Sequence, residues 1–146
     1  MKTYVIDASV ALKWISSEKE EELISAQKLY QNLKDGNLSI YTPTFLLVET
    51  ANILLKKKKL TKKEVGEYIN VILNCGINFI DFNYLKINDL LDITSEYDVT
   101  TYDGLYLLLA KEMNCQLVST DRELIEIAGI VLDLKETNSD TRKSAS

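Results

Sequence analysis

The stretch TYVIDASVALKW, at residues 3–14, places one charged residue between two apolar segments. Its first part, up to Ile6, is an apolar run typical of a buried β-strand, and residues 10–15 have the pattern of a helix start. Asp7 lies between them. Carboxylates are almost never fully buried without a partner. An acid at the end of an apolar strand is therefore a candidate functional residue, with capping of the following helix as the alternative.

Short apolar runs alternate with helical patterns along the rest of the chain. This alternation is typical of an α/β protein in which helices flank a parallel sheet. We expect strands at residues 2–6, 38–41, 77–82, 116–120 and 130–134. We expect helices up to residue 15 and at residues 17–36, 43–59, 61–75, 84–97, 100–114 and 121–129.

Three helix starts carry a recognisable cap. Ser17 with Glu20 and Thr61 with Glu64 have the spacing of a capping box. Thr42 followed by Pro43 has the pattern of an N-cap and a first helical residue.

Length and composition indicate one globular domain. The chain has 146 residues, enough to bury a sizeable core, and we expect a domain at residues 1–136 and a polar, disordered tail at residues 137–146. A net charge of −5 argues against a generally basic nucleic-acid binder but leaves room for a local basic patch. No signal peptide or membrane-spanning run is recognisable. We therefore expect a cytoplasmic protein with no membrane partner.

The sequence contains no histidine. This excludes Ser-His-Asp and Cys-His catalysis, histidine-ligated zinc, and ribonucleases that use imidazole as acid and base. If the chain is an enzyme, its carboxylates are the main candidates for the chemistry.

Four acids lie where apolar patterning would not place them: Asp7, Glu49, Asp103 and Asp121. We call them the acidic quartet. Asp103 and Asp121 each have a structural alternative as helix N-terminal acids. Glu49 has the weakest alternative, because a carboxylate within the apolar helix FLLVETANILL must be paired, protonated or metal-bound.

The expected fold can gather the quartet. Ligands of open parallel sheets bind at the carboxyl ends of the strands, where strand order reverses. If the first and fourth strands are neighbours there, Asp7 and Asp121 leave the same edge, and Glu49 and Asp103 can point into the same crevice. Because oxygen ligands without histidine or cysteine favour hard cations, we expect Mg²⁺ or Mn²⁺.

Four motifs, VIDASV, LLVETANILL, TTYDGLYLLLA and LVSTDREL, occur in order over residues 2–134. Together they resemble a PIN-domain ribonuclease, in particular a VapC-type toxin of a toxin–antitoxin pair. The resemblance implies a three-layer fold with sheet order 3-2-1-4-5, metal-dependent endoribonuclease activity, a homodimer and an antitoxin partner. The invariant acids of that family fall on the acidic quartet, as catalytic residues and metal ligands.

Two further groups are candidates for supporting roles. Ser9 and Thr120 resemble family positions near the metal or its water, with helix capping as an equal alternative. Lys56, Lys57, Lys58 and Lys59, which we call the lysine run, can contact RNA phosphates. A solvated helix end explains the same residues without a function.

Other functions fit less well. A haloacid-dehalogenase-type phosphatase requires a second Asp at the position of Ser9, and a receiver domain requires an acidic pair before Asp7. A PIN-like binding module without catalysis is disfavoured by the complete quartet. A housekeeping RNA-processing nuclease stays open beside the toxin.

Overall fold

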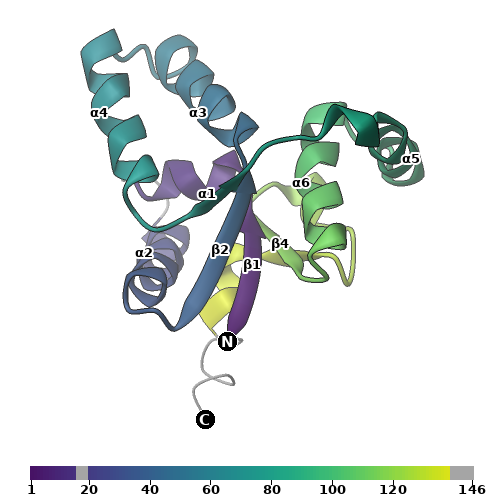
Figure 1. The fold of residues 1–146 in the computed structure, drawn as a ribbon. Coiled ribbons are helices and arrows are strands. Elements are labelled where there is room, and N and C mark those ends of the chain that lie inside the picture. The colour runs from purple at the N-terminus through teal and green to yellow at the C-terminus, as the bar shows by residue number, and fades with distance from the viewer. Residues whose placement is uncertain (16–19, 139–146) are drawn as a thin grey trace.

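The computed structural model describes residues 1–15 and 20–138. Five parallel strands form one sheet in the order β3-β2-β1-β4-β5, with β1 and β2 near its centre (Figure 1). The expected α/β class and strand order are confirmed. The strands are β1 (Lys2–Ile6), β2 (Leu38–Pro43), β3 (Asn78–Ile80), β4 (Gln116–Ser119) and β5 (Val131–Asp133).

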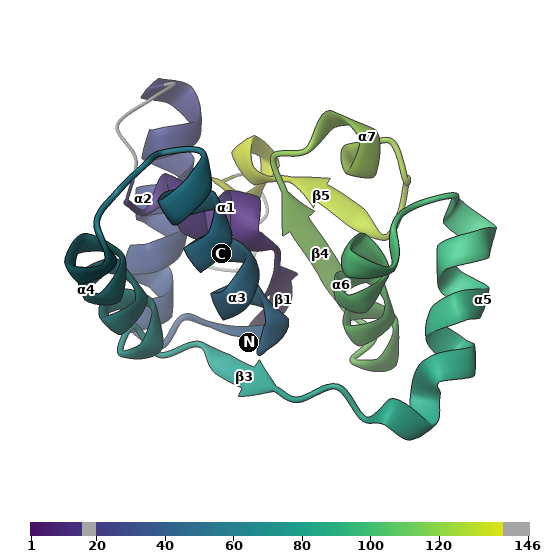
Figure 2. The ribbon, with the colours of Figure 1, turned by 90° about the horizontal axis from the view of Figure 1, so that it is seen from above.

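Helices cover both faces of the sheet. Seen from above, α1 to α4 gather on one side of β1 and α5 and α6 on the other, which gives the three expected layers (Figure 2). The α-helices are α1 (Ala8–Lys13), α2 (Glu20–Lys34), α3 (Phe45–Lys56), α4 (Lys62–Leu73), α5 (Ile87–Tyr97), α6 (Thr101–Glu112) and α7 (Arg122–Ile125). Two short 3-10 helices are η1 (Tyr84–Lys86) and η2 (Leu134–Glu136).

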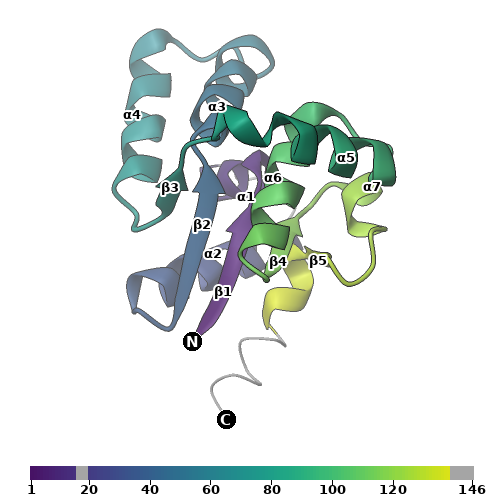
Figure 3. The ribbon, with the colours of Figure 1, turned by 45° about the vertical axis from the view of Figure 1, so that its right-hand side comes forward.

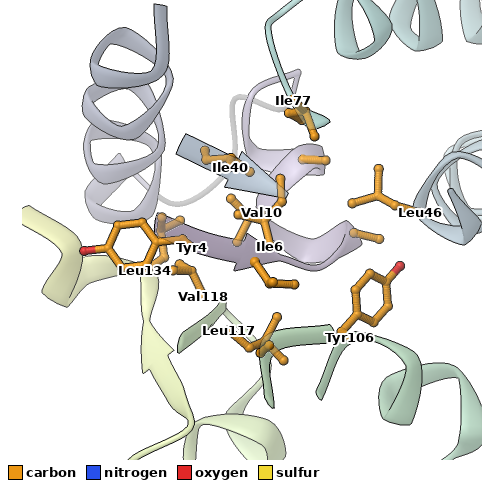
Figure 4. Close-up of a cluster of buried hydrophobic side chains, with 14 of the residues drawn as sticks. Tyr4, Ile6, Val10, Ile40, Leu46, Ile77, Tyr106, Leu117, Val118 and Leu134 are labelled. Carbon is orange, nitrogen blue, oxygen red and sulfur yellow. The ribbon is translucent and has the colours of Figure 1, made fainter. Parts of the chain in front are cut away.

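The core lies between the sheet and these helices. Tyr4, Ile6, Ile40 and Leu117 on the central strands are fully buried, and Figure 4 shows them packed with side chains from both helical layers. Parallel strands covered on both faces are apolar along their whole length. This is why the strands appear in the sequence as short continuous apolar runs.

The expected helix start at Thr42 and Pro43 is wrong. Both residues belong to β2, where Pro43 lies opposite Ile80. Thr42 is fully buried, and its hydroxyl donates a hydrogen bond to the carbonyl oxygen of Ile6 at 2.8 Å. A proline disfavours helical backbone at the residue before it, so it continues the strand here instead of opening the helix. Thr44 becomes the N-cap of α3 without a side-chain capping bond.

Other element boundaries differ by a few residues. Helix α3 ends at Lys56, and Lys59 has a left-handed backbone with φ 54°. The expected helix at residues 84–97 consists of η1 followed by α5, and Figure 3 shows this segment running from β3 toward α6. The capping box of Thr61 and Glu64 is confirmed. The one expected from Ser17 lies outside the described residues.

Helix α6 packs closely against α5 at Gly104. A Cβ atom at this glycine would lie 2.5 Å from Oγ1 of Thr94 and 3.1 Å from Cδ1 of Leu90. The absence of a side chain therefore allows α5 to approach the first turn of α6. The same turn carries Asp103.

Packing of the chain continues slightly beyond residue 136. Thr137 is buried and donates a hydrogen bond to the carbonyl oxygen of Leu134, and the Asn138 amide donates one to Ser25. The expected domain boundary stays a prediction, because residues 139–146 lie outside the described ones. Within residues 1–15 and 20–138, no helix has the length and apolar character needed to cross a membrane.

Candidate active site

The carboxyl ends of β1 and β4 lie side by side, as expected. The two strands pair in parallel with Ile6 opposite Val118, so Asp7 and Ser119 follow at the same edge of the sheet. Asp121 begins α7 just beyond β4. Figure 1 shows α1 and α3 next to this edge. Helix α6 begins near it too, because it leads back to the amino end of β4.

Asp7 is held on both carboxylate oxygens. Its side chain is buried, at 5% exposure for the residue. Oδ1 accepts hydrogen bonds from the Ser9 backbone N–H at 3.1 Å and from the Ser9 hydroxyl at 2.5 Å. Oδ2 accepts one from the Ser119 hydroxyl at 2.6 Å. Asp7 is also the N-cap of α1, so the structural alternative considered for it is correct as well.

The environment of Asp7 opposes its ionisation. The pKa of Asp7 is raised to about 6, chiefly by burial and also by the charge of Glu49, against hydrogen bonds from Ser119, Ser9 and the Val10 backbone that lower it. A buried carboxyl with such a pKa is only partly ionised near pH 6. A cation beside it would favour the charged form.

The hydroxyl that supports Asp7 from β4 belongs to Ser119, which the sequence reasoning missed. Ser119 is fully buried, and its oxygen also accepts a hydrogen bond from the Asp121 backbone N–H at 3.0 Å. Thr120, the expected residue, takes part through its backbone N–H, which donates to the Ser9 hydroxyl at 3.0 Å. A polar residue at the end of an apolar strand was the signal that could have found Ser119, as it found Asp7.

Glu49 lies in α3 and is half-buried. Its Oε1 accepts a hydrogen bond from the Tyr106 hydroxyl of α6 at 2.8 Å. The sequence predicted that this carboxylate would need a partner, and the structure supplies one. Burial and the charge of Glu49 raise the pKa of Tyr106 far above its usual value, so the phenol keeps the proton that it donates.

Asp103 and Asp121 lie at helix starts. Asp103 is in the first turn of α6, where Thr100 is the N-cap. Asp121 is exposed and is itself the N-cap of α7, accepting a hydrogen bond from the Glu123 backbone N–H at 2.9 Å. Burial raises the pKa of Asp103, and the charges of Asp121 and Glu49 raise it further. Both residues therefore also fit the structural alternative considered for them, that of acids at helix N-termini.

The quartet thus lies close enough to interact electrostatically. Asp7 is affected by Glu49, and Asp103 is affected by both Glu49 and Asp121. Within the described residues, however, no three acidic or cysteine side chains approach one another as a metal-binding group. The donor chemistry fits a hard divalent cation, because all four ligands offer oxygen and a cation would offset their repulsion. Binding it would require the carboxylates to move closer together.

The lysine run lies apart from the quartet. Lys56 ends α3, and the other three lysines form the exposed connection to α4. Lys56 follows Glu49 by seven residues of α3, or roughly 10 Å along the helix axis, and the run lies at the end of the helix away from the sheet (Figure 2). It therefore adds positive charge at a distance from the acids.

Comparison with known families matches most of the chain. The family model described as "PIN domain" matches residues 4–130. No curated protein matches the sequence.

Several solved structures have a similar fold. PAE2754 from Pyrobaculum aerophilum is 17% identical with a TM-score of 0.69, over 99% of this chain and 96% of that one. VapBC2 from Rickettsia felis, solved with a DNA fragment from its promoter, is 17% identical with a TM-score of 0.69, over 90% and 98%. VapC20 from Mycobacterium tuberculosis, described as a toxin that cleaves the sarcin–ricin loop, is 11% identical with a TM-score of 0.68, over 88% and 96%.

Proposed function

The chain belongs to the PIN-domain family, and on that basis we propose that it is a metal-dependent endoribonuclease that acts as the toxin of a type II toxin–antitoxin pair. The observation that carries the proposal is the acidic quartet at one edge of the sheet. The charge of Glu49 helps to raise the pKa values of Asp7 and Asp103, and the chain has no histidine to serve as an alternative catalyst.

Asp7, Glu49, Asp103 and Asp121 would hold Mg²⁺ or Mn²⁺. The bound cation would activate a water molecule and stabilise the charge that develops on a phosphodiester. Ser9 and Ser119 orient the carboxylate of Asp7 through hydrogen bonds to both of its oxygens. The N-terminal turns of α6 and α7 favour the negative charges of Asp103 and Asp121.

The substrate we propose is RNA, contacted in part by the lysine run. A chain with a net charge of −5 repels phosphate overall, so binding would depend on the cation and on local lysines. Cleavage of cellular RNA would place the protein in the cytoplasm.

An antitoxin and a second copy of the chain are the protein partners we propose. Two of the structural neighbours are the VapBC2 assembly and a toxin–antitoxin complex from Klebsiella pneumoniae, the latter with a TM-score of 0.63 at 13% identity. Exposed apolar side chains on η1 and α5 support an interaction with protein, because such clusters mark binding surfaces. They are Tyr84, Leu85, Ile87 and Leu91.

A housekeeping RNA-processing nuclease is the second candidate, since it would use the same quartet. The neighbouring reading frame separates the two: a small adjacent gene encoding a DNA-binding protein favours the toxin. A PIN-like binding module without catalysis would bind RNA but leave it intact.

The test is cleavage of single-stranded RNA by purified protein in EDTA and after addition of Mg²⁺ or Mn²⁺. We expect cleavage only with added metal, and none from Asp7→Asn. The matched control is Asp81→Asn, because Asp81 is an exposed acid just after β3 and lies outside the quartet. Rapid cleavage in EDTA, or near-normal cleavage by Asp7→Asn, would contradict the proposal.

A further inference from the structure

Helix α6 supplies two polar groups to the same side of the fold. Asp103 and Tyr106 are three residues apart, a spacing that places side chains next to each other on a helix surface. Asp103 belongs to the acidic quartet. The hydroxyl of Tyr106 reaches across to α3 and donates to Oε1 of Glu49 at 2.8 Å. One helix therefore carries one acid of the quartet and holds another.

The ring of Tyr106 is fixed in the core. Its exposure is 0%, and Figure 4 shows it between the sheet and the helix that carries Leu46. The ring of Phe45, one turn before Glu49 on α3, lies 6.4 Å from it at an angle of 57°. Phe45 in turn stacks on Tyr102 at 5.3 Å. The hydroxyl is thus presented from a rigid position, at the point where α3 and α6 meet.

Glu49 lies at the edge of the core, where the Tyr106 hydroxyl contacts it. Its neighbour Val48 is exposed and Thr50 is buried, so Glu49 lies at the boundary between solvent and core. Among the described residues, Tyr106 is the one side chain that hydrogen-bonds to Glu49. Without it, the flexible Glu49 side chain could turn to solvent. Because the contact occupies Oε1, Oε2 is the oxygen that would be offered to a cation.

We propose that Tyr106 is a positioning residue, which sets the orientation of the Glu49 carboxylate through its hydroxyl and so prepares the site for metal. The inference rests on the proposed function, because it takes Glu49 to be a metal ligand. The competing view is that Tyr106 is a core residue whose hydroxyl needs an acceptor and finds Glu49. The two views differ in what removal of the hydroxyl does to metal binding.

The experiment compares Tyr106→Phe with wild type. Phenylalanine keeps the ring and removes only the hydroxyl. The matched control is Tyr4→Phe, because Tyr4 is also fully buried but lies away from Tyr106 in the core (Figure 4). Mn²⁺ affinity is measured by electron paramagnetic resonance, and kcat and KM for RNA cleavage are measured separately. Groups that support a metal ligand typically contribute 10- to 100-fold. We therefore expect about a tenfold or greater loss of Mn²⁺ affinity in Tyr106→Phe and no such loss in Tyr4→Phe.

A double-mutant cycle shows whether Tyr106 acts through Glu49. In a Glu49→Gln background, Tyr106→Phe should produce little further loss of Mn²⁺ affinity. An equal loss in both backgrounds, or wild-type affinity and kcat in Tyr106→Phe, would overturn the positioning role. Failure of the proposed function looks different, because wild type itself would then neither bind Mn²⁺ nor cleave RNA.

Discussion

Asp7 and Asp121 leave neighbouring strands at the same edge of the sheet, yet their carboxylates are held differently. Asp7 is buried and accepts three hydrogen bonds from Ser9 and Ser119. Asp121 is exposed and accepts one, from the backbone of the following helix. Burial is costly for a charge and exposure is not. Ionisation of Asp7 is therefore costly in the folded state, whereas Asp121 can be changed with little effect on stability.

The largest expected effect is on cleavage, and it should be shared by both acids. Asp7→Asn and Asp121→Asn each remove one carboxylate oxygen that a cation would contact. We expect each to lower kcat/KM by more than the roughly 10- to 100-fold typical of groups that only support a metal ligand. Steady-state cleavage of RNA with Mn²⁺ measures this. Normal activity of Asp121→Asn would leave that residue with a purely structural role as a cap.

Stability should separate the two acids. The pKa of Asp7 is raised to about 6 from 3.8, so the folded state favours its protonated form. The stabilisation of the folded state that comes from protonated Asp7 is fully present below about pH 4 and is lost as pH rises through 6. In EDTA, the free energy of unfolding of Asp7→Asn relative to that of wild type should therefore rise by up to about 3 kcal/mol between pH 4 and pH 8. Asp121→Asn keeps a capping residue and should change stability by about 0.5 kcal/mol or less.

Urea unfolding at several pH values measures both differences. The comparison would break if the stability of Asp7→Asn relative to wild type did not rise between pH 4 and pH 8 without metal. That result would mean that the folded state does not favour the protonated form of Asp7.

Removal of the Ser119 hydroxyl tests the contrast between Asp7 and Asp121 by taking away a hydrogen-bond donor to Asp7. Its bond to a buried carboxylate should contribute about 1–3 kcal/mol, so Ser119→Ala should lower the free energy of unfolding by that amount. Thr120→Ala is the control, because Thr120 contacts Ser9 through its backbone, and we expect about 0.5 kcal/mol or less. Equal effects of the two variants would contradict the assignment of the supporting hydroxyl to Ser119.

The position of Asp103 should depend on how α6 packs against α5. Gly104→Ala places a Cβ atom 2.5 Å from Thr94 and should destabilise the protein by about 1–3 kcal/mol, with Asp103 displaced. Gly66→Ala in α4 is the control, because nothing lies within 4 Å of the added atom. It should stabilise the helix by up to about 1 kcal/mol. Thermal melts of both variants check the sign of the change in stability. An unchanged melting temperature for Gly104→Ala would mean that α5 can shift to accommodate the added Cβ atom.

The smallest expected effect is that of the lysine run, which lies at the far end of α3. Replacing its four lysines by alanine should weaken RNA binding and reduce its salt dependence. The slope of log K against log salt should fall by about 0.7 for each phosphate that the lysines no longer neutralise. Binding measured over a salt series tests this. An unchanged slope would assign the run to a solvated helix end.

The sequence predicted the sheet order through a family resemblance and the edge position of Asp7 through its apolar neighbours. It misplaced the end of β2, because Thr42 and Pro43 also fit a helix start. It pointed to Thr120 rather than Ser119, because a serine in a strand does not reveal where its hydroxyl points. The role of Tyr106 was hidden for a similar reason: helical periodicity predicts a buried ring, but the Glu49 contact depends on how α3 and α6 pack.

The central claim is that the four acids form one metal site. Melting temperatures at increasing Mn²⁺, for EDTA-treated wild type and for Asp7→Asn, Glu49→Gln, Asp103→Asn and Asp121→Asn, test it most directly. A cation bound only by the folded state raises the melting temperature of wild type, and we predict that each single substitution removes most of that rise. A full Mn²⁺-induced rise in all four variants would contradict a shared metal site.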